Sequence, residues 1–130
     1  MQIDLNGFTD YLRKHIRTDG RYGECAKYVR RALEEGGGAD IPADYPRKAK
    51  LYGDTLMGLG FHKITVDDPD HFNFIRGDIM VMEPWSGNAV DAGHIAGYDG
   101  QQWISDFIQR DFWAGPAYRK VRPQYAVYRH

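Results

Sequence analysis

The chain has 130 residues, and its 17 Lys and Arg against 18 Asp and Glu give a formal net charge of -1. This balance gives no support to nucleic-acid binding, which requires a basic excess, and a hydrophobic content of 42% argues against a disordered chain. The length suits one compact domain. The apolar runs are too short to cross a bilayer and none follows Met1, so we expect neither membrane insertion nor a signal peptide.

Apolar residues recur at helical spacing through the first half of the sequence. They predict a first helix over about residues 8–16, a second from Cys25 to the run Gly36-Gly37-Gly38, and a third over about residues 46–59. The three consecutive glycines are a strong signal for the end of the second helix, because glycine adopts the backbone conformation that a helix C-terminus requires.

The second half of the sequence changes from helical to strand patterns. It predicts five short strands, over about residues 61–66, 77–82, 94–98, 102–108 and 121–128. Asp99-Gly100 is the predicted turn of a hairpin between the third and fourth of them. Helices followed by an antiparallel sheet predict an α+β fold in which the N-terminal helices pack on the sheet.

Cys25 is the only cysteine and therefore forms no disulfide within the chain. It follows a glycine and opens the second predicted helix, so its thiol lies in the positive end of the helix dipole, which favours the thiolate. A cysteine in this position is also common as a small buried core residue. The sequence therefore leaves two interpretations, a thiol nucleophile and a non-catalytic binding module with Cys25 in its core.

His94 is the candidate partner for this thiol. Of the five histidines it alone is preceded by glycine and followed by an apolar strand that ends in a turn. A cysteine at the start of a helix and a histidine on a following strand are the arrangement of a nucleophile and its base.

The residue that orients the imidazole should lie on the strand next to His94. A two-residue turn at Asp99-Gly100 would pair His94 with Ser105, whereas a three-residue turn with a bulge would pair it with Asp106. We favour Asp106, because a carboxylate is the better partner for an imidazolium. The sequence contains no motif for a metal or cofactor, since there is no HExxH and no paired cysteine.

Three motifs together carry a family resemblance. Residues 23–29 (GECAKYV), 76–81 (RGDIMV) and 93–100 (GHIAGYDG) resemble, in this order, the CHAP and NlpC-like amidases of the papain-like superfamily. The resemblance extends from about Tyr22 to Ile108. It implies a papain-like α+β fold and a single catalytic domain over residues 1–130.

The resemblance implies a cysteine amidase or endopeptidase that cleaves the peptide stems of bacterial peptidoglycan, without a cofactor or metal. In that interpretation Cys25 is the nucleophile, His94 the general base and Asp106 the orienting residue. Tyr22 matches a position near the nucleophile where an aromatic side chain shapes the substrate site. Gly77-Asp78 is expected to have a structural role.

Many such enzymes carry a cell-wall-binding repeat or a signal peptide, and we expect neither in this chain. It therefore resembles phage lysis enzymes or small amidase effectors that a type VI secretion system injects into rival bacteria, and residues 103–109 look more like the effectors. We then expect delivery from the cytoplasm to the periplasm of a target cell, and an immunity protein as the inhibitory partner. The alternatives are a phage lysis enzyme, another thiol acyl hydrolase or transferase, and the binding module. The sequence does not indicate which stem-peptide bond is cut.

Overall fold

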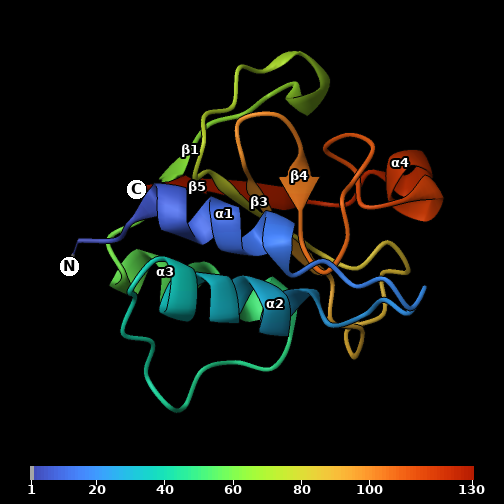
Figure 1. The fold of residues 1–130 in the computed structure, drawn as a ribbon. Coiled ribbons are helices and arrows are strands. Elements are labelled where there is room, and N and C mark those ends of the chain that lie inside the picture. The colour runs from blue at the N-terminus through green and yellow to red at the C-terminus, as the bar shows by residue number, and fades with distance from the viewer. Residues whose placement is uncertain (1) are drawn as a thin grey trace.

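The computed structural model describes residues 2–130. Its helices cover one face of a twisted antiparallel sheet (Figure 1). The strands are β1 (His62–Ile64), β2 (Ile79–Met82), β3 (His94–Tyr98), β4 (Trp103–Ile104) and β5 (Tyr125–Arg129), in the spatial order β1-β5-β2-β3-β4. The α-helices are α1 (Leu5–Lys14), α2 (Cys25–Arg31), α3 (Gly53–Gly58) and α4 (Pro116–Val121). The chain also forms a π-helix, η1 (Ala32–Gly36), and two 3-10 helices, η2 (Ala49–Leu51) and η3 (Pro69–His71). The predicted α+β class with an antiparallel sheet is confirmed.

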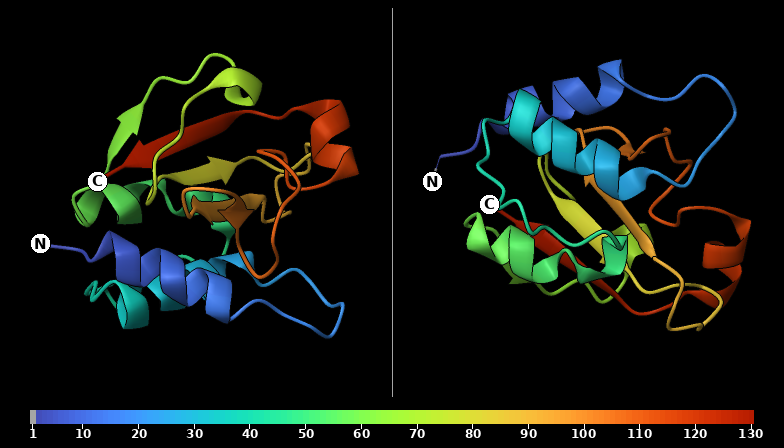
Figure 2. Two further views of the ribbon diagram at one scale, coloured as in Figure 1. Left: turned by 45° about the horizontal axis from the view of Figure 1, so that its top comes forward. Right: turned by 90° about the horizontal axis from the view of Figure 1, so that it is seen from below.

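The sheet separates two apolar clusters. On one face lie α1, α2 and α3 (Figure 2), and Ile95 of β3 belongs to the cluster that these helices form with the sheet. Ala96, the next residue of β3, belongs to an aromatic-rich cluster on the other face, which includes Trp103 and Phe112. Because side chains alternate along a strand, β3 supports both clusters. None of the helices described in residues 2–130 has both the length and the apolar character that crossing a membrane needs.

The carboxylate of Asp4 caps α1 by accepting the N–H of Gly7 at 2.9 Å.

Two glycines, Gly7 of α1 and Gly36 of η1, let these two helices approach closely. A β-carbon on Gly36 would lie 2.7 Å from Cβ of Tyr11 and would also contact the carbonyl oxygen of Gly7. Gly36 therefore does more than end a helix, because its missing side chain sets the spacing between two backbones.

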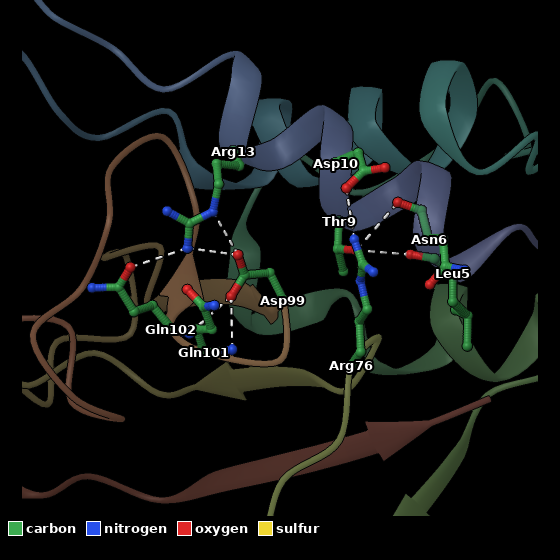
Figure 3. A network of polar contacts seen from close by, with 9 residues as sticks. All are labelled: Leu5, Asn6, Thr9, Asp10, Arg13, Arg76, Asp99, Gln101 and Gln102. Atoms are coloured by element: carbon green, nitrogen blue, oxygen red, sulfur yellow. Dashed lines mark hydrogen bonds and ion pairs between the residues drawn. The ribbon is translucent and has the colours of Figure 1, made fainter.

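Arginine side chains fasten α1 to the sheet loops (Figure 3). Arg13 donates to the carboxylate of Asp99 at 2.6 Å and to the amide oxygen of Gln102 at 3.0 Å. Near the middle of the helix, Arg76 donates to Thr9 at 2.7 Å and to Asp10 at 2.6 Å. These contacts fix the helical layer against the loop that follows β3 and against the segment that precedes β2.

Asp78 occupies the start of β2, as its expected structural role requires. Its carboxylate is fully buried and accepts two hydrogen bonds of 2.9 Å from the guanidinium of Arg129 on β5. It also accepts the backbone N–H of Ile75 at 2.9 Å. A bidentate pair of this kind fixes how β5 meets β2.

Several predicted boundaries are corrected. The second helix begins at Cys25 as predicted and continues through the π-helical η1 to Gly36, but the third does not form over residues 46–59. Lys48 is extended (φ −89°, ψ 132°), so only η2 and α3 are helical in this segment. The strand predicted over residues 121–128 begins at Tyr125, because Pro116 opens α4, a helix that the strand pattern missed.

Candidate active site

Cys25 lies at the start of α2, which packs against β3. Its side chain is 8% exposed. Cys25 belongs to the same apolar cluster as Ile95, the residue that follows His94 on β3. The helix and strand predicted to carry the thiol and the imidazole are thus in contact.

Burial raises the pKa of the Cys25 thiol to about 11, and this effect outweighs the helix start. The negative charge of Asp106 raises this pKa further. The backbone N–H groups of Ile95, Ala26 and Cys25 lower it, but by less than burial raises it. The expectation that the helix dipole favours a thiolate is therefore not met in the resting protein. At neutral pH the sulfur is a buried thiol that needs a base to accept its proton.

His94 is held by a glutamine that the sequence analysis did not identify. Its Nε2 lies 2.8 Å from Oε1 of Gln109. The amide nitrogen of Gln109 donates to the carbonyl oxygens of Asp111 (3.1 Å) and Phe112 (3.2 Å), so Oε1 must be the atom that faces the imidazole. His94 Nε2 therefore carries the hydrogen, and Nδ1 has a free lone pair for the thiol proton.

The imidazole is almost completely buried, with 6% exposure. Burial lowers the pKa of His94, while the hydrogen bond to Gln109 and the charge of Asp106 act to raise it. The net lowering keeps the imidazole neutral at neutral pH, which is the form that accepts a proton. Cys25 and His94 are thus both neutral at neutral pH.

Asp106 does not make the hydrogen bond to His94 that was predicted for it. The carboxylate is fully buried and accepts the backbone N–H groups of Gly23 at 3.1 Å and Glu24 at 3.0 Å. Ser105, the alternative partner, donates its hydroxyl to Asp106 at 3.2 Å instead of contacting the imidazole. The charge of Asp106 nevertheless raises the pKa of both Cys25 and His94, and its carboxylate anchors the two residues that precede the thiol.

The hairpin register explains this difference. β3 and β4 pair as Gly97 with Ile104 and Tyr98 with Trp103, so a four-residue loop replaces both turns that were considered. Asp99 creates that loop, because its carboxylate accepts the N–H groups of the third and fourth loop residues at 3.0 and 2.8 Å.

The chain beyond β4 turns back instead of continuing as a strand. The N–H of Ser105 donates to the carbonyl of Phe107 at 3.0 Å, and Ile108 forms a bridge back to Ile104. The N–H of Gln109 then bonds to the carbonyl of Trp103 at 2.8 Å. This tight turn brings Gln109 to the imidazole, and only the polar Ser105-Asp106 pair inside an apolar run could have indicated it.

Two tyrosines, Tyr118 and Tyr22, belong to the aromatic surroundings of His94. The ring of Tyr118 on α4 is 6.0 Å from that of His94, and burial, with a smaller contribution from the charge of Cys25, raises the pKa of Tyr118 to about 12. Tyr22 is 59% exposed, and its ring packs on Phe107 at 4.8 Å, which in turn lies 6.0 Å from His94. The substrate-binding role of Tyr22 stays a prediction.

A pocket of about 240 Å³ opens beside Cys25, between the start of α2 and the segment 45–49. Its walls carry the cationic side chains Lys27, Arg30 and Arg47. Within residues 2–130, no group of three His, Cys, Asp or Glu side chains is arranged to hold a metal ion.

The fold and the site define an α+β protein in which a thiol at a helix start lies beside an imidazole-bearing strand. No protein-family model and no curated protein matches the chain. Among solved structures, it is similar to a chain of the native type VI effector–immunity complex Tae3–Tai3 from Ralstonia pickettii, with 38% identity and a TM-score of 0.81 over 98% of both chains. The selenomethionine form of that complex matches with 39% identity and a TM-score of 0.78, over 95% of this chain and 99% of the other. The chain therefore belongs to the Tae3 family of type VI effectors.

Proposed function

We propose that this protein is a cysteine amidase that hydrolyses an amide bond in the peptide stems of bacterial peptidoglycan, with a papain-like, NlpC/CHAP-like site in a single catalytic domain. One observation carries the proposal. His94 lies on β3, the strand that contacts helix α2 and therefore the element that begins at Cys25. The hydrogen bond from His94 Nε2 to Gln109 leaves Nδ1 as the only ring nitrogen free to accept a proton. A buried neutral thiol beside a buried neutral base is suited to acyl transfer.

The reaction begins with proton transfer from the Cys25 thiol to Nδ1 of His94 as the sulfur attacks the substrate carbonyl. A C–S bond forms, and the backbone N–H of Cys25 stabilises the negative oxygen. When the C–N bond breaks, the His94 imidazolium gives its proton to the leaving amine. Water then attacks the thioester carbon while one of its protons passes to His94. The C–S bond breaks, a carboxylic acid is released, and the His94 imidazolium returns its proton to the Cys25 sulfur.

Gln109 replaces Asp106 as the orienting residue in this mechanism. Its Oε1 accepts the Nε2–H of His94 throughout the cycle, and its amide nitrogen is fixed by two backbone carbonyls. Asp106 positions the nucleophile from the other side, because it holds the N–H groups of Gly23 and Glu24. Catalysis then requires neither a metal nor a cofactor.

Membership of the Tae3 family supports an antibacterial role for this activity. The similar solved chains come from type VI effector–immunity complexes. We infer that the protein is delivered by a secretion machine into the periplasm of a target cell, where its substrate is exposed. We further infer that a cognate immunity protein covers the opening beside Cys25, and such a complex should protect the thiol from iodoacetamide.

Digestion of purified Gram-negative sacculi tests the activity. The wild-type protein and Cys25→Ala are incubated with sacculi, and the products are resolved by mass, with circular dichroism to verify that the variant is folded. Muropeptide fragments that appear only with the wild type support the proposal and identify the bond. Intact sacculi with both proteins, or the same fragments with both, would contradict it.

A further inference from the structure

The pocket beside Cys25 has an excess of positive charge. Lys27, Arg30 and Arg47 line it, and Glu24 is the one acidic side chain among its lining residues. The carboxylate of Glu24 already pairs with Arg17, at 3.0 Å. The pocket therefore presents cations that its own acidic residue does not neutralise.

Two of these cations have no ionic partner in the part of the chain that the structure describes. Within residues 2–130, neither Lys27 nor Arg47 forms an ion pair. Lys27 is half-buried, on the first turn of α2, and Arg47 is exposed in the segment 45–49 that also lines the pocket. Two cations that line one pocket repel one another, and an anion bound there relieves that repulsion.

The third cation is held in place. The guanidinium carbon of Arg30 lies 3.9 Å from the centre of the Tyr45 ring, and its Nε is 3.6 Å from the carboxylate of Glu34. Stacking on an aromatic ring fixes the plane of the guanidinium before a ligand binds. The pocket is therefore preorganised on this side.

We propose that this pocket is the subsite for a free carboxylate of the substrate peptide, adjacent to the amide that Cys25 attacks. The inference rests on the proposed function and adds a specificity to it. Because Cys25 itself lines the pocket, a group bound there belongs to the molecule being cleaved. A volume of about 240 Å³ admits one acidic side chain, and charge-assisted hydrogen bonds to lysine and arginine select a carboxylate over a carboxamide.

Cleavage kinetics provide the first test. The substrate is a purified muropeptide with free carboxylates, and the comparison is the same muropeptide after its carboxylates are converted to carboxamides. We expect the wild type to prefer the acid by about 10- to 100-fold in kcat/KM, mostly through KM. The double variant Lys27→Gln/Arg47→Gln should cleave both forms with a ratio near one. Lys63→Gln on the distant strand β1 is the matched control and should keep the preference.

Binding provides a second test that does not depend on turnover. Calorimetry with the inactive Cys25→Ala protein should show weaker binding of the carboxamide form, and adding Lys27→Gln/Arg47→Gln should weaken binding of the acid form to the same level. The preference for the acid should also shrink at high salt.

The outcomes separate the two proposals. If both forms are cleaved and bound equally well by the wild type and the double variant, the carboxylate subsite is wrong and the amidase proposal stands. If neither form is bound or cleaved by any variant, both proposals are wrong.

Discussion

Oε1 of Gln109 lies 2.8 Å from Nε2 of His94, and the glutamine amide nitrogen is tied to two backbone carbonyls behind it. A glutamine held in this way cannot exchange its oxygen and nitrogen without losing three hydrogen bonds. It therefore fixes both the orientation and the tautomer of the imidazole. Burial lowers the pKa of His94, and Gln109, as a neutral acceptor, offsets this lowering less than a carboxylate would.

Gln109→Met removes the acceptor while keeping a side chain of similar length. We expect kcat to fall about 10- to 100-fold with little change in KM, because a lost hydrogen bond of about 1–3 kcal/mol no longer orients the base. The same bond raises the pKa of His94, so its loss should move the acid limb of the kcat/KM profile to lower pH.

Gln109→Glu supplies the opposite shift. A carboxylate at this position should raise the pKa of His94 and move the acid limb to higher pH. Both profiles are measured with the wild type in parallel. Acid limbs that coincide for all three proteins would show that Gln109 does not act through His94.

The protonation state of Cys25 leads to a second prediction. Since burial raises the thiol pKa to about 11, the rate of alkylation by iodoacetamide should rise about tenfold per pH unit between pH 7 and 10, without levelling off. Alkylation is followed by intact mass, and a small thiol of ordinary pKa, which levels off near pH 9, is the control. A plateau below pH 8 would instead indicate a stable thiolate–imidazolium pair.

Asp106→Asn tests the effect of the Asp106 charge on the pKa values of Cys25 and His94. The carboxylate raises the pKa of Cys25 because it opposes a thiolate, and it raises the pKa of His94 because it favours an imidazolium. Its neutralisation should lower both pKa values, so that alkylation at pH 8 becomes faster and the acid limb of activity moves down.

Asp106→Ala separates this charge from the anchoring of the nucleophile. It leaves the N–H groups of Gly23 and Glu24 without their acceptor and should cost about 1–3 kcal/mol of stability, measured by urea unfolding. Equal unfolding midpoints for Asp106→Ala and wild type would contradict the anchoring role.

The sequence predicted the parts of the fold that depend on local patterns. The helix that opens at Cys25 and the strand that opens at His94 were both predicted at their observed first residue. Glycine runs and apolar periodicity carry this information within a few residues of each boundary. The contact between α2 and β3, the elements that carry Cys25 and His94, agrees with placing these two elements side by side.

Gln109, the hydrogen-bond partner of His94, was not predicted, because its position depends on tertiary structure. The Asp99 carboxylate accepts two backbone N–H groups of the hairpin loop, which makes this loop longer than either turn that the sequence suggested. Each residue added to a hairpin loop shifts the register by one and so changes which side chains face His94. The turn after Ile104 then brought Gln109 into place, through backbone bonds that no residue pattern specifies. A carboxylate was chosen for its charge, whereas the fold uses Asp106 to hold backbone N–H groups.

Gly36→Ala tests the close crossing of α1 and η1, on which the position of the helical layer depends. An added methyl would overlap the carbonyl of Gly7 and lie 2.7 Å from Cβ of Tyr11, so the two backbones must separate. We expect a loss of about 1–3 kcal/mol in the free energy of unfolding, the usual cost of overpacking. Gly58→Ala is the matched control, because a β-carbon there meets no atom within 4 Å and alanine favours the helix. Urea unfolding should therefore separate the two variants, with Gly36→Ala below the wild type and Gly58→Ala at or above it, and a Gly36→Ala midpoint equal to that of the wild type would show that the crossing tolerates a side chain.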